Sequence, residues 1–164
     1  MKTILLGNAG AGKSTLAGLL VARHPAARLS LDTVAFAGSS ERLPLQESVA
    51  AVRRFIAAHD SWILEGCYAD ILEPVLPLAE TLIFLNPGVE VCLEHCRARP
   101  WEPEKFGSRE DQEANLAFLL DWVRAYDSRG DEYGLRRHRR LFDAFQGMKW
   151  EFTHPSQYSR ALKA

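Results

Sequence analysis

Short apolar runs alternate along this chain with longer stretches in which apolar residues recur at helical spacing. Continuous apolar runs are typical of strands buried on both faces, and the helical repeat is typical of amphipathic helices. The predicted strands are residues 3–7, 27–32, 61–66, 80–88 and 148–154. The predicted helices are residues 13–23, 44–60, 89–98, 109–126 and a short one from Pro155 onward. Strands separated by helices indicate an α/β fold whose parallel sheet is covered by helices on both faces.

One segment interrupts this alternation. Residues 97–108, RARPWEPEKFGS, combine prolines, a tryptophan and charges without a helical period. Long loops of this kind in compact domains are often lids over a binding site. The chain contains no internal repeat, so we predict a single domain over residues 1–164 with a short lid at 97–108.

The composition and net charge of the chain argue against two classes of partner, nucleic acids and membranes. With 20 Lys+Arg and 21 Asp+Glu, the net charge of −1 provides no basic field for nucleic acid. No apolar run is long enough to span a bilayer, so we expect no membrane segment, and the first residues lack a signal-peptide pattern. The three cysteines do not resemble a disulfide framework, which indicates a reducing cytoplasm.

The strongest chemical signal is the glycine-rich stretch GNAGAGKST at residues 7–15. It matches G-x-x-x-x-G-K-[ST] and lies between a predicted strand and a predicted helix, which is the context this phosphate-binding motif requires. Glycines let the backbone turn its N–H groups toward a triphosphate, and the start of the helix adds partial positive charge. Lys13 is expected to reach the β- and γ-phosphates, and the Ser14 hydroxyl to ligate Mg²⁺.

ATP and Mg²⁺ are therefore the expected cofactors. The predicted nucleotide-binding residues are Gly7, Asn8, Ala9, Gly10, Ala11, Gly12, Lys13, Ser14 and Thr15.

The tighter form G-x-x-G-x-G-K-S-T resembles the small P-loop kinases of the adenylate kinase and shikimate kinase group. The stretches LSLD, WILEGCY and AETLIFLNPGVEVCLEHCRAR are similar to later strands, turns and lid arginines of those kinases, and WILEGCYADIL also resembles bacterial proteins labelled DNA topology modulation proteins. The resemblance implies a three-layer P-loop NTPase fold with strand order 2-3-1-4-5 and ATP-dependent transfer of a phosphoryl group to a small molecule. The chain departs from the adenylate kinase pattern at Glu65, where that family carries an Asp-Gly pair.

Two carboxylates are candidates for the rest of the site. Asp32 ends a predicted strand, and the carboxyl ends of strands are where open α/β sheets bind ligands, so we expect it to orient the phosphoryl acceptor. The alternative is a turn or cap aspartate. Glu65 ends another apolar run and is expected to lie near the metal, with an ion pair at a strand end as the alternative.

Arg97 and Arg99 precede the predicted lid. Arginines that close over the transferring phosphoryl would stabilise its developing charge and exclude water, and the alternative is a solvated helix end. Arg124, on the helix that follows the lid, is a weaker candidate of the same kind.

Three further features favour structural interpretations. Cys92, His95 and Cys96 form C-x-x-H-C, but no second ligand pair follows, so two core thiols are expected rather than zinc. The basic cluster at residues 136–140 is accompanied by an apolar stripe, which indicates a solvated helix face rather than a nucleic-acid site. The His-Pro pair at 154–155 follows the fifth strand, where the resembling kinases place a loop near the adenine.

The sequence therefore predicts a small-molecule kinase whose partners are a nucleotide and a nucleotide, nucleoside or small-alcohol acceptor. Two other functions stay open: a non-enzymatic ATP- or GTP-binding regulator, and a simple NTP hydrolase.

Overall fold

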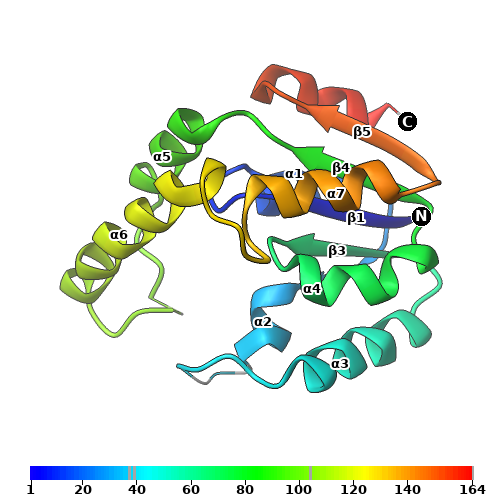
Figure 1. The fold of residues 1–164 in the computed structure, drawn as a ribbon, viewed down its shortest axis with the longest axis horizontal. Helices are drawn as coiled ribbons and strands as arrows, with labels where there is room; N and C mark the ends of the chain where they lie inside the picture. Colours follow the sequence, from blue (N-terminus) through cyan, green and yellow to red (C-terminus); the bar gives the residue numbers. More distant parts are fainter. Residues whose placement is uncertain (37, 39, 104, 164) are drawn as a thin grey trace.

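The computed structural model of the protein describes residues 1–36, 38, 40–103 and 105–163, whose strands form one parallel sheet with helices on both faces (Figure 1). The strands are β1 (Lys2–Gly7), β2 (Ala27–Ser30), β3 (Trp62–Gly66), β4 (Thr81–Leu85) and β5 (Met148–Phe152). They lie in the order β2-β3-β1-β4-β5, and each neighbouring pair is parallel. The predicted α/β class and the strand order implied by the kinase resemblance are confirmed.

Alternate residues of β1 enter two separate cores, one on each face of the sheet. Ile4 and Leu6 belong to the first core, and Leu5 belongs to the second. The first core is covered by α2 (Leu31–Phe36), α3 (Leu45–Ala57), α4 (Ala69–Leu72), η1 (Glu73–Leu78) and α7 (Leu135–Ala144). The second is covered by α1 (Lys13–Arg23), α5 (Val89–Arg97), α6 (Arg109–Arg124) and η3 (Pro155–Leu162), and η2 (Ala125–Asp127) follows α6.

The structure corrects the predicted second strand. Residues 27–32 were expected to be extended, but β2 ends at Ser30, where its pairing with β3 also ends. Leu31 and Asp32 begin α2 instead, and Leu31 is fully buried in the first core. The alternation of apolar and polar residues in the sequence extends one residue beyond the strand. This is because Leu31 is apolar for its packing in α2 and not for a place in β2. The short helices α4 and η1 were also not predicted.

The strands point their carboxyl ends toward α5 and α6, which pack against each other and project beyond the sheet on the left of Figure 1. The turn between β1 and α1 lies at the same edge of the sheet. Parallel sheets bind ligands at this edge, so the arrangement defines where a site is to be sought. Within the described residues, no helix is long and apolar enough to cross a membrane.

Candidate functional site

The glycine-rich loop, residues 7–15, joins β1 to α1 through a backbone that requires glycine at two positions. Gly10 and Gly12 have φ angles of 78° and 94°, which side chains with a Cβ rarely adopt. A Cβ on Gly10 would lie 2.3 Å from the carbonyl oxygen of Cys92. The loop therefore passes directly against α5, and the two glycines allow this close approach.

The loop presents donors and a cation rather than side-chain bulk. Gly12 is the N-cap of α1 and has no side chain to cap it, so the N–H groups of the first helical turn are left for a ligand. The Lys13 ammonium donates to the carbonyl oxygens of Gly7 at 3.0 Å and Asn8 at 2.7 Å, across the loop. This arrangement suits an anion placed at the start of α1.

A cleft of about 870 Å³ opens beside this loop. Most of the predicted binding residues line it, namely Ala9, Gly10, Gly12, Lys13, Ser14 and Thr15. Gly7, Asn8 and Ala11 do not line the cleft and are buried beneath the loop. The Asn8 amide donates to the carbonyl oxygen of Val123 at 3.3 Å, so its side chain ties the loop to α6.

Glu65, at the end of β3, is the buried acid of the cleft. It is 2% exposed. Its Oε2 accepts a hydrogen bond from the Ser14 hydroxyl at 2.8 Å, and its Oε1 accepts from the Arg28 guanidinium. The ion-pair alternative for Glu65 is therefore observed, and its role near a metal stays a prediction that the neighbouring Ser14 hydroxyl is compatible with. A charged group buried this deeply needs such partners.

These oxygens fit a magnesium ion. Mg²⁺ prefers oxygen ligands and is usually held by one or two protein groups together with substrate phosphates. Ser14 and Glu65 provide a hydroxyl and a carboxylate side by side. The described residues contain no group of three or more His, Cys, Asp or Glu that would hold a metal without a phosphate ligand.

Arg28 is a site residue that the sequence analysis missed. It lies within β2, in register with Ile63 of β3, and its Nε is 3.0 Å from Glu65 Oε1. No local sequence signal indicates Arg28, because the residue is exposed and its partner is 37 positions away.

Asp32 lines the cleft. It was predicted to end a strand, and that placement is wrong. It is exposed in the first turn of α2, and its Oδ1 accepts a hydrogen bond from the Tyr68 hydroxyl at 2.6 Å. Burial raises the pKa of Tyr68, and the Asp32 charge raises it further, so the phenol keeps its proton. Tyr68 therefore acts as a fixed donor that orients the carboxylate.

An aromatic cluster supports Tyr68. Its ring packs edge-on against Tyr133, with centroids 5.4 Å apart, and Tyr133 packs against Trp122 of α6 at 4.8 Å. Arg42 lies over the Tyr68 ring at 5.3 Å, and Arg129 lies over the Trp122 ring at 3.6 Å. Tyr68 and Trp122 both line the cleft, so this cluster forms one of its walls.

A buried histidine of α7, on the same face of the sheet as Tyr68, supports this wall. His138 of α7 is fully buried; its Nε2 lies 2.8 Å from the carbonyl oxygen of Cys67, and its Nδ1 lies 2.8 Å from the Tyr126 hydroxyl. Burial lowers the pKa of His138 to about 4. A carbonyl can only accept, so the neutral ring donates through Nε2 to Cys67 and accepts from Tyr126 through Nδ1. The ring thereby holds the backbone just before Tyr68.

The cleft thiol Cys67 is not an activated nucleophile. Burial raises its pKa to about 11, which keeps the sulfur protonated near neutral pH. Cys92 and Cys96 are buried free thiols of the second core, as predicted. His95 stands apart from them: it is exposed, lines the cleft, and places Nδ1 2.7 Å from the Gly10 carbonyl oxygen.

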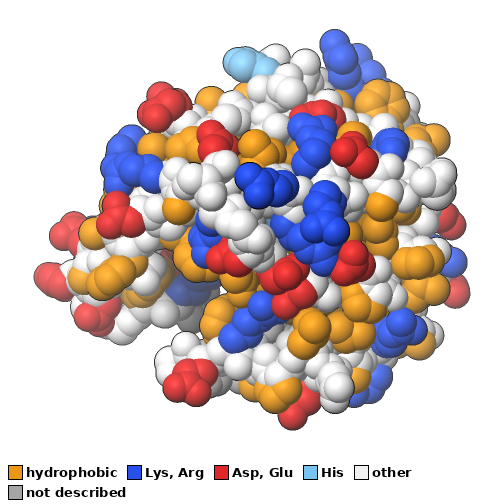
Figure 2. All heavy atoms as spheres, viewed as in Figure 1, with side chains coloured by type: hydrophobic (Ala, Val, Ile, Leu, Met, Phe, Trp, Pro, Cys, Tyr) orange, Lys and Arg blue, Asp and Glu red, His pale blue; other side chains and the backbone are white. Residues whose placement is uncertain are grey.

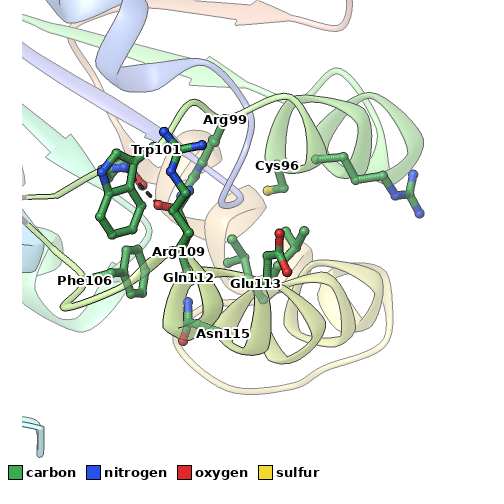
Figure 3. A pocket seen from close by; sticks show the side chains of 12 residues that line it. Cys96, Arg99, Trp101, Phe106, Arg109, Gln112, Glu113 and Asn115 are labelled. Carbon is green, nitrogen blue, oxygen red and sulfur yellow. Dashed lines mark hydrogen bonds between the residues drawn. The ribbon is translucent and has the colours of Figure 1, made fainter.

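The two predicted lid arginines occupy different surroundings. Arg99 lines the cleft, and it also lines a second pocket of about 290 Å³ between α5, the segment 97–108 and α6. Arg97 lines only the second pocket, so the structure does not bring it to the glycine-rich loop. Figure 3 shows Arg99 and Arg109 close to Trp101 in this second pocket.

The described part of the segment 97–108 is attached to α6 by one glutamine. Gln112 accepts a hydrogen bond from the Glu102 backbone at 2.9 Å and donates to the Pro100 carbonyl oxygen at 2.9 Å. Glu104, within the predicted lid, lies outside the described residues. The weaker candidate Arg124 pairs with Asp121 at 2.9 Å and does not line the cleft.

The two residues of the His-Pro pair at 154–155 have different positions. His154 caps η3 through its side chain, whereas Pro155 lines the cleft. In the same helix, Tyr158 donates to the Ala11 carbonyl oxygen at 2.8 Å and lies against Gly12. Helix η3 therefore supports the glycine-rich loop from the side opposite α5.

The basic cluster at residues 136–140 is a solvated helix face only in part, because Arg136 and Arg140 are exposed whereas His138 is fully buried. Arg137 pairs with Glu73 at 2.5 Å and with Glu132 at 3.1 Å, and Arg139 pairs with Glu151 at 2.6 Å. Figure 2 shows Lys and Arg side chains interleaved with Asp and Glu on the face that carries α7. Such pairing leaves no uniform positive surface for a nucleic-acid backbone.

The chain matches no protein-family model, and comparison with curated proteins found no match either. The arguments for function therefore rest on the geometry of the cleft.

Proposed function

We propose that the protein is an ATP-dependent phosphotransferase that acts on a small hydroxyl-bearing acceptor. The observation that supports the proposal is that one cleft contains both a candidate triphosphate site and a candidate acceptor site. The uncapped start of α1, with Lys13 and the Ser14–Glu65 pair, suits a triphosphate and its metal. The oriented carboxylate of Asp32 faces the same space and suits a hydroxyl group.

The residues divide the work of phosphoryl transfer between them. The first-turn N–H groups and Lys13 hold and neutralise the phosphates. Ser14 and Glu65 hold Mg²⁺, which supplies charge neutralisation to the phosphate oxygens when bound. Asp32 orients the acceptor hydroxyl and accepts its proton, and Arg99, a cation of segment 97–108 that lines the cleft, stabilises the transferring phosphoryl.

The proposed partners are thus ATP and a small molecule rather than a nucleic acid. A reducing cytoplasm is the proposed location, in keeping with the three free thiols.

Production of ADP tests this function against its two rivals. The assay uses ATP and Mg²⁺ with panels of nucleosides, nucleotides and small alcohols, together with Lys13→Ala and the control Lys163→Ala, an exposed lysine outside the cleft. A phosphotransferase gives acceptor-dependent ADP that Lys13→Ala abolishes and Lys163→Ala retains. Steady acceptor-independent ADP would instead indicate a hydrolase, and binding without turnover would indicate a regulator.

A further inference from the structure

Charge is distributed unevenly around the cleft. Among the described residues that line it, the Lys and Arg side chains are Lys13, Arg99 and Lys105. Lys13 belongs to the glycine-rich loop, and Arg99 follows α5, the helix that packs against Gly10. Lys105 is already paired with Glu102 at 2.8 Å. Among the described residues that line the cleft, Lys13 and Arg99 are therefore the Lys and Arg side chains for which no carboxylate partner is found.

Another part of the lining, here called the acceptor wall, consists of Asp32, Tyr68, Phe118 and Trp122. It is continuous, because Tyr68 binds Asp32 and Tyr133 packs against both Tyr68 and Trp122. Phe118 lies one helical turn before Trp122 on α6 and is 77% exposed. The wall thus offers one carboxylate and several aromatic rings.

The arginines nearest this wall are already engaged. Arg42 pairs with Asp70 at 2.7 Å and donates to the Tyr133 hydroxyl at 2.9 Å. Arg129 binds both carboxylate oxygens of Asp131, at 2.8 and 2.7 Å. Neither arginine lines the cleft. A phosphate or carboxylate on an acceptor is bound most strongly by cationic donors, and the acceptor wall presents an anion instead.

We propose that the acceptor is an uncharged hydroxyl compound with a flat ring, such as a nucleoside or an aromatic alcohol, and that the site rejects acceptors bearing a phosphate or carboxylate. This inference rests on the proposed phosphotransferase function and names its substrate class. The flat ring lies against Phe118 and Trp122, since aromatic pairs and apolar contact favour that placement. The hydroxyl then meets the oriented carboxylate of Asp32.

The transfer step balances with these groups. The acceptor oxygen forms a bond to the γ-phosphorus of the nucleoside triphosphate, while the bond from that phosphorus to the β-γ bridging oxygen breaks. The bridging electron pair leaves with ADP. The hydroxyl proton passes to Asp32 and from there to water, so the products are the phosphorylated acceptor, ADP and a proton.

Matched pairs of acceptors test the inference. Each pair is one ring-bearing alcohol with and without a phosphate or carboxylate, for example a nucleoside and its monophosphate, and kcat/KM is measured for both. Like-charge repulsion from Asp32 and the missing cation predict that the uncharged member is favoured by about tenfold or more. A preference for the charged member would overturn the inference while leaving the phosphotransferase function in place. If neither member raises ADP formation above the acceptor-free rate, the proposed function fails and this inference fails with it.

Asp32→Asn separates charge from shape, with Asp121→Asn as the matched control because Asp121 is on α6 outside the cleft. Affinities of both members are measured by competition, which does not depend on turnover. Removal of the Asp32 charge should tighten binding of the phosphate-bearing member severalfold and weaken binding of the uncharged member, whose hydroxyl loses a charged hydrogen-bond acceptor. Asp121→Asn should change neither. Equal affinities in Asp32→Asn and the wild-type protein for the charged member would contradict the role of Asp32.

Discussion

Two of the carboxylates that line the cleft, Glu65 and Asp32, are held in opposite ways. Glu65 is buried, and both of its oxygens are occupied by Ser14 and Arg28. Asp32 is exposed, and Tyr68 engages one of its oxygens while the other has no hydrogen bond from the described residues. The partners of Glu65 fix its carboxylate in one position, since a buried charge needs such partners. Asp32 keeps one oxygen open to the cleft, so we propose that Glu65 serves the metal side and that Asp32 meets the acceptor.

Removal of the Glu65 charge should have the largest effect on activity. Glu65→Gln removes the charged acceptor of the Ser14 and Arg28 hydrogen bonds, and we expect the free energy of unfolding to fall by about 2 kcal/mol, with loss of Mg²⁺-dependent ADP formation. Urea denaturation and the ADP assay measure the two effects.

The double variant Arg28→Met, Glu65→Gln sharpens this expectation. It removes both charges, so much of the stability should return while activity stays absent. Recovery of activity in the double variant would show that Glu65 serves only as an ion-pair partner.

Acid should destabilise the protein through His138. Its pKa is about 4 in the folded protein against 6.5 for the unperturbed group, so only the unfolded chain is protonated between these values. Stability from this group is therefore complete above pH 6.5 and is lost as the pH falls toward 4. The expected loss is about 3 kcal/mol.

The measurement compares wild-type protein with His138→Gln by urea denaturation across this pH range. Carboxylates such as Glu151, whose pKa Arg139 lowers, act in both proteins and cancel in the difference. Parallel pH curves for the two proteins would exclude the assigned role of His138.

Arg99 and Arg97 form a matched pair two positions apart. Arg99→Ala removes a cation from the cleft and should lower kcat by about a hundredfold with little change in ATP affinity. Arg97→Ala alters only the second pocket, so kcat should stay within about twofold of wild type. Steady-state kinetics provide both values, and similar losses in the two variants would show that Arg97 reaches the reacting phosphoryl as well.

The smallest effect is expected on the acceptor wall. Tyr68→Phe removes the 2.6 Å hydrogen bond to Asp32 but retains the aromatic packing. We expect kcat to fall by about tenfold through loss of carboxylate orientation, while unfolding free energy changes by about 1 kcal/mol. A variant with unchanged kcat would mean that Asp32 needs no orienting donor.

Local patterns predicted the sheet and the glycine-rich loop, because strand, turn and helix signals there lie within a few residues of one another. Long-range partners were beyond such patterns. Arg28 and Glu65 are 37 positions apart in the sequence, and His138 and Cys67 are 71 positions apart, so no local spacing indicates either pair. Asp32 was predicted to end a strand because its neighbour Leu31 fits an alternating pattern. In the structure Leu31 is buried in the first core as the first residue of α2.

Calorimetric titration with ATP and Mg²⁺ tests the central claim, which is that the glycine-rich loop binds a nucleoside triphosphate. Wild-type protein and Lys163→Ala should bind with equal affinity. A Lys13→Ala protein that retains the wild-type circular dichroism spectrum should lose affinity by about a hundredfold, because Lys13 is the cation of the loop itself. Undiminished ATP binding by the folded Lys13→Ala protein would contradict the account.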